Sequence, residues 1–364
     1  MDLIIFQTNL NLKGGAENVI LRIADKYNPV LYTFNYNKEK TWAGFKEHDI
    51  KIIKPYAMNK FFTVKSAYGF HNFKLKENYD VINPHWSPSH WISQNNERVL
   101  WYCHSPHRAF YDLYSLRMKE RSNLLTKAGF YSLTKIYRKL NYPIVQKIEK
   151  VICNSKNVQD RLSTYLNKSS DIIHPGVDVN DFNPGDYKNY FLIPGRITSS
   201  KRLEFALKAF FVFKKNHPDF ELIIAGSALD SDRPYLCKLK KYGVAKFLLN
   251  LPEKEYQQVC RDAYAHLFTA INEDFGITPL EAMACEKPII SVNEGGPRET
   301  IIEGKTGYLV NSPEEMVAKM SLLADNFDLV EKIGKTGRKH VKENFSWSVF
   351  LEKFNNALKE VSRK

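Results

Sequence analysis

The sequence predicts a parallel α/β protein with two domains, and three observations support this prediction. Short apolar runs alternate with amphipathic helical stretches along the chain, which is typical of parallel sheets with helices on both faces. The length of 364 residues suits about two domains at roughly 100–200 residues each. The alternation pauses at 172–185, a short polar stretch with two prolines and two glycines, and then restarts.

Each half of the chain has its own set of predicted strands. In the first half, apolar runs bounded by polar loops predict strands at 3–6, 29–34, 80–82, 99–103 and 150–153. In the second half, similar runs predict strands at 190–194, 221–225, 247–250, 266–268 and 288–292. Thr278 followed by Pro279 has the pattern of an N-cap and the first position of a helix. We expect domains at 1–170 and 171–345, and a terminal helix at 346–364 that packs back on the first domain.

The charge of the chain is unevenly distributed. The net charge is +13, and residues 1–170 carry 26 basic and 13 acidic side chains, so the excess lies in the first half. It is densest at 115–150, with nine basic and two acidic residues mixed with leucine, isoleucine and aromatic side chains. Such a segment can contact an anionic membrane surface, although an ordinary amphipathic helix with solvated lysines would have the same composition.

The composition of 43% hydrophobic and 26% charged residues excludes a disordered or fibrous protein. No segment is apolar enough to span a membrane, and the first residues read as a strand rather than a signal peptide. Five scattered cysteines without a CxxC pair suggest reduced thiols and no zinc site. These features lead us to expect a cytoplasmic protein that associates peripherally with the inner face of the membrane.

A basic loop at 195–201 is the first candidate binding site. It follows a predicted strand and opens a helix, and it contains Arg196 and Lys201. Five residues apart across a turn, these cations can approach one dianion, and the helix N-terminus adds N–H groups and partial positive charge. This loop therefore predicts a diphosphate site.

Two glutamates form the second candidate. Glu273 lies in a loop after a predicted strand, and Glu281 lies in the helix that begins at Pro279. They flank a turn containing Gly276, whose N–H groups could bind phosphate, while the carboxylates could accept hydrogen bonds from sugar hydroxyls. The downstream segment 293–299 contains two glycines and two glutamates. With this segment nearby, the two glutamates and the turn are unlikely to occur together by chance.

In this combination of motifs, the chain resembles retaining glycosyltransferases of family 4, which have the GT-B fold. The resemblance covers nearly the whole chain and depends on the order of its motifs: Gly14-Gly15-Ala16-Glu17, His104, Cys153-Asn154-Ser155, His174-Pro175-Gly176-Val177-Asp178, Gly195-Arg196 with Lys201, Ala225-Gly226, Glu273 with Glu281, and Gly295-Gly296 with Glu299. It implies two Rossmann-like domains with parallel sheets facing each other across a deep cleft. The second domain would hold a nucleotide-sugar donor, and the first would receive the acceptor.

The resemblance also implies a role for each matching residue. Catalysis would depend on His104 beside the sugar, on Arg196 and Lys201 at the diphosphate, and on Glu273 at the sugar hydroxyls. The donor would be held by Gly15, Gly195, Arg196, Lys201, Gly226, Leu251, Glu273, Phe275, Gly276, Ile277 and Glu281, with Glu281 at the ribose. The family's reaction retains the anomeric configuration without a metal, a cofactor or an enzyme nucleophile.

The segment 104–112 resembles mannosyltransferases of this family that use GDP-mannose. We therefore expect mannose from GDP-mannose as the donor, with a UDP-hexose (glucose, galactose or N-acetylglucosamine) as the alternative. A glycan or lipid-linked glycan is the expected acceptor, with His85, His107 and Arg108 on the acceptor side.

Other functions are less well supported by the sequence. A nucleic-acid-binding protein would account for the basic first half, but no recognised nucleic-acid motif is present, so no nucleic-acid partner is expected. Neither Gly304-Lys305-Thr306 nor Gly334-Lys335-Thr336 has the preceding glycine of a P-loop. Asp230 and Asp232 imitate a metal motif but are better placed to cap a helix, so no metal site is expected.

Overall fold

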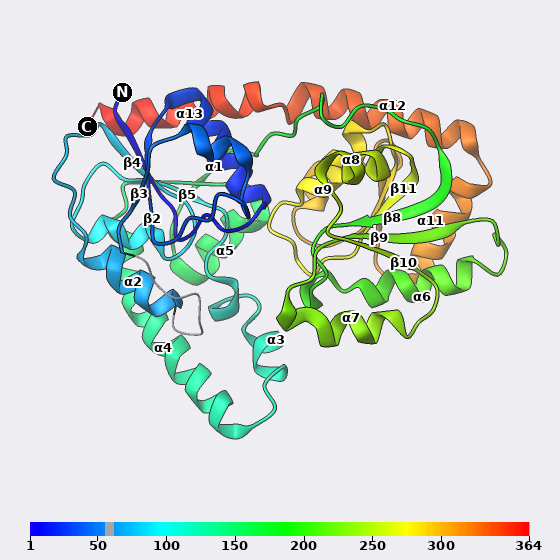
Figure 1. Ribbon diagram of the computed structural model, residues 1–364, viewed down its shortest axis with the longest axis horizontal. Helices are drawn as coiled ribbons and strands as arrows, with labels where there is room; N and C mark the ends of the chain where they lie inside the picture. Colours follow the sequence, from blue (N-terminus) through cyan, green and yellow to red (C-terminus); the bar gives the residue numbers. More distant parts are fainter. Residues whose placement is uncertain (55–61, 364) are drawn as a thin grey trace. The chain divides into compact units, whose positions relative to one another are not determined.

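The computed structural model describes residues 1–54 and 62–363, and these form two compact units (Figure 1). The first unit comprises Met1–His174 together with Phe350–Lys364, and the second comprises Pro175–Val349. Every strand pair in both units is parallel. The predicted α/β class with parallel sheets is therefore confirmed.

The first unit is built on two sheets linked by a bridge. One sheet has the order β3-β2-β1-β4 and the other the order β5-β6-β7, and a parallel bridge between Ile82 and Val99 connects them. The strands are β1 (Leu3–Phe6), β2 (Val30–Thr33), β3 (Ile50–Ile52), β4 (Val81–Pro84), β5 (Leu100–Cys103), β6 (Lys150–Cys153) and β7 (Asp171–Ile172). Trp101, Tyr102 and Phe6 are among its largest fully buried side chains.

The second unit repeats this topology in one sheet of order β10-β9-β8-β11-β12-β13. Its strands are β8 (Lys188–Pro194), β9 (Glu221–Gly226), β10 (Lys246–Leu249), β11 (Ala263–Phe268), β12 (Ile289–Val292) and β13 (Gly307–Val310). Counted along the unit, this is the 3-2-1-4-5-6 order of dinucleotide-binding folds, in which the strand order reverses between the first and fourth strands.

Helices connect the strands of each unit. Those assigned wholly or mainly to the first unit are α1 (Gly15–Tyr27), α2 (Phe62–Asn72), α3 (Tyr114–Lys119), α4 (Leu124–Lys147), α5 (Lys156–Leu166) and α13 (Trp347–Ser362). Those of the second unit are α6 (Leu203–Phe213), α7 (Arg233–Lys240), α8 (Glu253–Arg261), α9 (Ile277–Ala284), α10 (Pro297–Thr300), α11 (Pro313–Ala324) and α12 (Phe327–Asn344). None of the described helices is long and apolar enough to cross a membrane.

The structure corrects the predicted start of one helix. Helix α9 begins at Ile277, and its N-cap is Gly276 rather than Thr278. Gly276 has a φ of 85°, a left-handed conformation that favours glycine. The helix therefore starts earlier than the Thr-Pro pattern predicts, and the glycine turn leads directly into its first N–H groups.

Candidate active site

The second unit places the predicted donor-binding loops at its topological switch point. The loop 195–202 follows β8, the loop 269–276 follows β11, and these two strands are neighbours in the sheet. In open α/β sheets, ligands bind beyond the carboxyl ends of the strands at this position. The backbone joins the two loops, since the Ile271 N–H donates a 2.8 Å hydrogen bond to the Ser200 carbonyl oxygen.

Lys201 and Glu273, two of the predicted site residues, are in direct contact. Lys201 Nζ donates to Glu273 Oε2 at 3.0 Å, and the side chains are 23% and 24% exposed. Lys201 also lies over the ring of Phe268, at 5.3 Å from its centroid. The ammonium group is thus held at the carboxyl end of β11 and remains partly open to solvent, where it can approach an anionic ligand.

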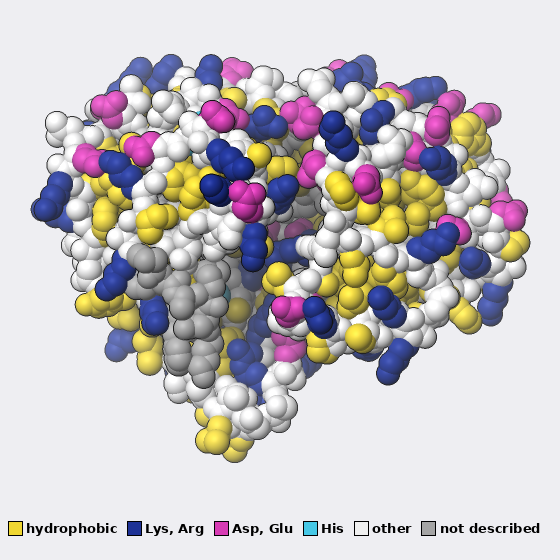
Figure 2. Space-filling view, viewed as in Figure 1, with side chains coloured by type: hydrophobic (Ala, Val, Ile, Leu, Met, Phe, Trp, Pro, Cys, Tyr) yellow, Lys and Arg dark blue, Asp and Glu magenta, His cyan; other side chains and the backbone are white. Residues whose placement is uncertain are grey.

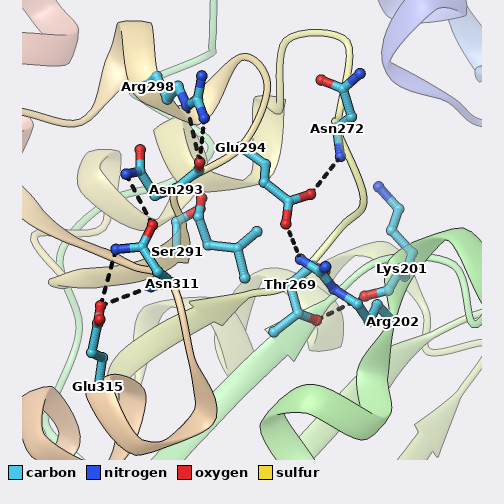
Figure 3. Close-up of polar contacts among 11 residues, drawn as sticks. Lys201, Arg202, Thr269, Asn272, Ser291, Asn293, Glu294, Arg298, Asn311 and Glu315 are labelled. Carbon is cyan, nitrogen blue, oxygen red and sulfur yellow. Dashed lines mark hydrogen bonds and ion pairs between the residues drawn. The ribbon is translucent and has the colours of Figure 1, made fainter. Parts of the chain in front are cut away.

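A second ion pair supports this one and was missed in the sequence (Figure 3). Arg202 Nη2 donates to Glu294 Oε1 at 2.8 Å, and the other oxygen of Glu294 accepts from the Asn272 N–H at 3.2 Å. Thr269 Oγ1 donates to the Lys201 carbonyl oxygen at 2.7 Å. Three loops, those after β8, β11 and β12, are therefore tied together around the predicted site. The only signal in the sequence was Glu294 within the glycine-containing segment 293–299.

Close backbone approaches in the site require glycine. A Cβ atom at Gly226 would lie 1.8 Å from the Gly195 carbonyl oxygen, so the ends of β8 and β9 can meet only without a side chain there. A Cβ at Gly295 would lie 2.4 Å from the Glu273 carbonyl oxygen, and Gly295 has a positive φ of 64°. The predicted donor residues Gly195 and Gly226 thus shape the loops from which the polar groups extend.

Glu281 lies on α9, four residues after its first residue Ile277, and its environment differs from that of Glu273. Its Oε2 atom is buried and has no hydrogen-bond partner within residues 1–54 and 62–363. Burial, with a smaller contribution from Glu253, raises the pKa of the Glu281 carboxyl to about 8. A carboxyl group that is neutral at pH 7 both donates and accepts hydrogen bonds, which suits recognition of a pair of hydroxyls.

The remaining predicted donor residues have varied surroundings. Arg196 is exposed, Phe275 is buried, and Ile277 and Leu251 are half-buried. Gly15 is exposed in the first turn of α1, which follows the loop after β1 in the first unit. Arg196 and Lys201 both belong to the loop after β8, but only Lys201 has a described ion pair with Glu273.

In the first unit, the predicted residue His104 directly follows β5. It is 5% exposed, and its Nε2 lies 3.0 Å from Nδ1 of His85. The His104 ring stacks on Trp86 with 5.8 Å between centroids. His85 is fully buried, and its acceptor-side role stays a prediction.

His107 and Arg108, predicted on the acceptor side, lie beside an internal ion-pair network. His107 stacks on Phe110 with centroids 4.2 Å apart, and burial lowers the pKa of its imidazole to about 4. Arg108 Nη2 pairs with Asp112 at 2.8 Å, and Arg161 pairs with the same carboxylate at 3.4 Å. Arg108 therefore has a role in fixing the loop after β5.

The described residues contain no group of three or more histidine, cysteine or acidic side chains placed to hold a metal ion. Asp230 pairs with Arg233 at 3.0 Å, and Asp230–Asp232 form a short 3₁₀ helix before α7. The Asp232 side chain makes no capping hydrogen bond to that helix.

Comparisons with known proteins identify related sequences. Residues 178–340 match the family model of group 1 glycosyl transferases. Alpha-1,3/1,6-mannosyltransferase ALG2 of Dictyostelium discoideum is 27% identical over 315 residues, covering 73% of this chain and 71% of that protein. A probable sucrose-phosphate synthase of Thermosipho melanesiensis is 31% identical over 204 residues, covering 52% of this chain and 47% of that protein. The chain thus spans about half of this second relative.

Among solved structures, the Anabaena protein HepE in complex with UDP and glucose has a TM-score of 0.76 at 15% identity, and the alignment covers 99% of each chain. This likeness shows the fold, which is that of the GT-B glycosyltransferases. Two Rossmann-like units with a polar site beyond the first and fourth strands of the second unit define this class of enzyme. Within it, residues 178–340 match the group 1 glycosyl transferases, and together with the mannosyltransferase relatives this match supports a hexosyltransferase.

Proposed function

We propose that this enzyme transfers mannose from GDP-mannose to a glycan or lipid-linked glycan, with retention of the anomeric configuration and without a metal ion. The observation that carries the proposal is the contact between Lys201 and Glu273 at the switch point. It brings a cation for a diphosphate next to a carboxylate for sugar hydroxyls. The likeness to a mannosyltransferase of Dictyostelium supports mannose. A UDP-hexose is the second candidate, because the Anabaena neighbour is in complex with UDP and glucose.

The charges of the site suit a nucleotide diphosphate. A diphosphate near Lys201 offers its ammonium a stronger partner than one carboxylate, and Arg196 of the same loop can add a second cation. Glu273 would then be available to accept hydrogen bonds from the transferred sugar. Glu281, one turn into α9, would hold the ribose hydroxyls. The first N–H groups of α9 lie at the helix N-terminus, where they and the partial positive charge of the helix favour binding of a phosphate.

The same groups account for the catalytic step. As the bond between the sugar and the diphosphate breaks, negative charge grows on the leaving phosphate and positive charge on the sugar ring. Lys201, Arg196 and the N-terminus of α9 stabilise the leaving group without rearranging, which is the largest contribution in many enzymes. The acceptor hydroxyl attacks from the face that the diphosphate leaves, so the configuration is retained and no covalent enzyme intermediate forms.

Donor choice and stereochemistry can be measured together. Thermal-shift assays with GDP, UDP and ADP and their common sugar conjugates should give the largest stabilisation for GDP-mannose, since stabilisation follows RT ln(1 + [L]/Kd) and reaches about 2.7 kcal/mol at 100 Kd. NMR of the product should show an α-linked mannose, and EDTA should leave the rate unchanged. Preferential stabilisation by a UDP-sugar would show that a UDP-hexose, and not GDP-mannose, is the donor. An inverted product would exclude retention, and a strict divalent-ion requirement would exclude the metal-free mechanism.

For the acceptor side, helix α4 has the character of a surface that binds anionic membranes. Its 24 residues include no aspartate or glutamate but five lysines and arginines. Leu124 and Leu125 at its first turn are 81% and 87% exposed, and Ile136 and Leu140 further along are 58% and 50% exposed. Figure 1 shows the loop between α3 and α4 projecting from the first unit at the bottom of the view, and Figure 2 shows hydrophobic side chains there.

An anionic bilayer could bind both the exposed apolar side chains and the basic side chains of α4. The exposed leucines can enter the acyl region, and each basic residue near the surface contributes about 1 kcal/mol. Vesicle flotation should therefore recover the protein with phosphatidylserine-containing vesicles and not with neutral ones. Leu124→Ser with Leu125→Ser should abolish recovery, whereas Leu322→Ser, which changes an exposed leucine of the second unit, should not. Equal recovery with both vesicles, or concentration-dependent dimerisation that the leucine changes abolish, would contradict the membrane proposal.

A further inference from the structure

Glu294, in the loop after β12, binds the chain neighbours of both ionic residues of the candidate site (Figure 3). One carboxylate oxygen, Oε1, accepts a 2.8 Å hydrogen bond from Nη2 of Arg202, which directly follows Lys201. The other oxygen, Oε2, accepts a 3.2 Å hydrogen bond from the N–H of Asn272, which directly precedes Glu273. We propose that Arg202 and Glu294 are positioning residues of the transferase, which hold Lys201 and Glu273 at the spacing that a sugar diphosphate requires.

The backbone at both contacts adopts a conformation that needs support. Arg202 has a φ of 47° and Asn272 has a φ of 44°, both in the left-handed region. Asparagine tolerates this region, whereas a long side chain such as arginine adopts it at a cost, and such residues persist where the surrounding structure fixes them. The guanidinium of Arg202 provides this fixation, because its Nε also donates to the Thr269 carbonyl oxygen at 3.2 Å. One rigid plane thus joins the loops after β8, β11 and β12.

Glu294 is itself anchored, so it can act as a fixed point for the other two loops. The carbonyl oxygen of the preceding residue, Asn293, accepts hydrogen bonds from Nε and Nη2 of Arg298 at 2.9 and 2.7 Å. Two residues after Glu294, the Gly296 N–H donates to the Glu273 carbonyl oxygen at 2.9 Å. The loop after β12 is therefore held by its own arginine and bound to the backbone of the Glu273 loop.

A second role for Arg202 would be direct binding of phosphate. The Arg202 and Glu294 side chains are 27% and 36% exposed, so solvent reaches both. Their charges cancel, however, and the pair adds no net positive charge for a diphosphate. An arginine that left Glu294 to bind phosphate would contribute to affinity independently of Lys201, whereas a positioning residue acts through Lys201. A double-mutant cycle distinguishes the two roles.

The test uses nucleotide binding, because the inference rests on the proposed role of Lys201 at the diphosphate. GDP and UDP are titrated calorimetrically into the whole chain and its variants, and the nucleotide that binds more tightly is followed. Arg202→Asn keeps a residue that tolerates the left-handed conformation but does not reach Glu294, and it should weaken binding about tenfold. Glu294→Gln should weaken binding by a similar factor, because its single oxygen cannot reach both neighbours. The two changes together should weaken it no further, since they break the same contact.

The cycle is completed with Lys201→Ala. In that background, Arg202→Asn and Glu294→Gln should each change affinity by less than about twofold, because the group that they position is absent. A full additional loss there would show that the pair acts independently of Lys201 and would overturn the proposal. Unchanged affinity in Arg202→Asn and Glu294→Gln, with a loss in Lys201→Ala, would also overturn it and leave the proposed function standing. Unchanged affinity in Lys201→Ala would instead contradict the proposed function.

A matched control separates positioning from charge and from stability. Glu221 pairs with Lys246 at 2.7 Å, at the first residues of β9 and β10, so Glu221→Gln removes the same charge from the opposite end of the sheet. It should leave nucleotide affinity within about twofold. The melting temperature of Arg202→Asn should change little, because relief of the left-handed arginine offsets the loss of a partly exposed ion pair. An equal loss of affinity in Glu221→Gln, or a loss that follows a fall in melting temperature, would overturn the proposal.

A crystal structure of Glu294→Gln tests the geometry without any ligand. The distance from Lys201 Nζ to Glu273 Oε2 is 3.0 Å in the wild-type chain. In the variant, this distance should change by more than about 0.5 Å, the tolerance within which a site stays productive. An unchanged distance would overturn the positioning role, whatever the outcome of the nucleotide titrations.

Discussion

The two units share a strand order but differ in the charge that they place at the carboxyl ends of their strands. In the second unit, the ion pairs Lys201–Glu273 and Arg202–Glu294 have side chains that are 23–36% exposed. In the first unit, the corresponding region contains His85 and His104, of which His85 is buried and kept neutral. One Rossmann-like framework thus supports a charged, accessible site and a neutral, enclosed one.

This difference changes the meaning of the net charge. Residues 1–170 carry the whole excess of +13, yet the donor phosphates are expected at cations of the second unit. In the first unit, the cations of α4 (Leu124–Lys147) are not offset by any carboxylate within that helix. In α12 of the second unit, by contrast, Lys335 pairs with Glu331 and Lys339 with Glu343. Five cations of the first unit therefore lie together on one helix without a carboxylate of that helix beside them.

Removing the charged site of the second unit should have the largest effect. Lys201→Ala should lower kcat/KM for hexose transfer about 10²–10³-fold, which is the usual loss for one group that stabilises developing negative charge. Circular dichroism and the melting temperature should change little, because the Lys201–Glu273 pair is partly exposed and such pairs contribute about 0–1 kcal/mol. Steady-state kinetics with saturating acceptor would measure the loss.

A matched control is available in the same unit. Lys305 is exposed in the turn before β13, and Lys305→Ala removes the same charge from the unit without changing the switch point. Its kcat/KM should stay within about twofold of the wild-type value. Equal losses of kcat/KM in both variants would mean that the effect comes from net charge. Unchanged transfer in Lys201→Ala would show that Lys201 does not belong to the active site.

Glu281 allows a test through pH. Its pKa is raised to about 8 by burial, so between pH 5 and 8 the folded protein keeps a proton that the unfolded chain has lost. The free energy of unfolding should then fall as the pH rises, by at most about 1.4 kcal/mol per pH unit, and level off above the folded pKa. In Glu281→Gln this pH dependence should be weaker by one proton, whereas affinity for the nucleotide should change little, because an amide both donates and accepts hydrogen bonds as a neutral carboxyl does.

Urea unfolding at several pH values measures the first effect, and titration with the nucleotide measures the second. Glu273→Gln is the comparison, since it replaces a second carboxylate of the site, one that is partly exposed and ion-paired. A Glu281→Gln variant with the wild-type pH dependence would show that Glu281 is ionised in the folded protein at neutral pH.

The strands that were predicted are those with continuous apolar runs, such as β1 and β8. Strand β3 (Ile50–Ile52) was missed because it has three residues with Lys51 in the middle, and it exists through its pairing with β2. Strand β7 has two residues, too few for any periodicity. Strand β13 (Gly307–Val310) was missed as well, although three of its four residues are buried, because four residues that begin with glycine give only a weak pattern.

The site divides in the same way. The pair Glu273 and Glu281 could be found because the two residues flank one turn within a short stretch of sequence. Arg202 and Glu294 could not be found, because they are 92 positions apart and Arg202 adopts a left-handed φ of 47°, which no local pattern indicates. The burial of His85 likewise depends on strands that are separated in sequence and packed together only in the fold.

The last comparison concerns backbone packing, where one glycine of each unit can be compared. Gly226→Ala in the second unit would place its Cβ 1.8 Å from the Gly195 carbonyl oxygen, so the ends of β8 and β9 must separate at a cost of about 1–3 kcal/mol. Gly129→Ala on α4 of the first unit meets no atom within 4 Å and should raise the free energy of unfolding by about 0.4–1 kcal/mol. Chemical denaturation measures both, and nucleotide affinity should fall in Gly226→Ala alone, because only that change displaces the Gly195 loop from the diphosphate. Equal affinity in the two variants would mean that the β8 loop tolerates displacement and that its position does not determine donor binding.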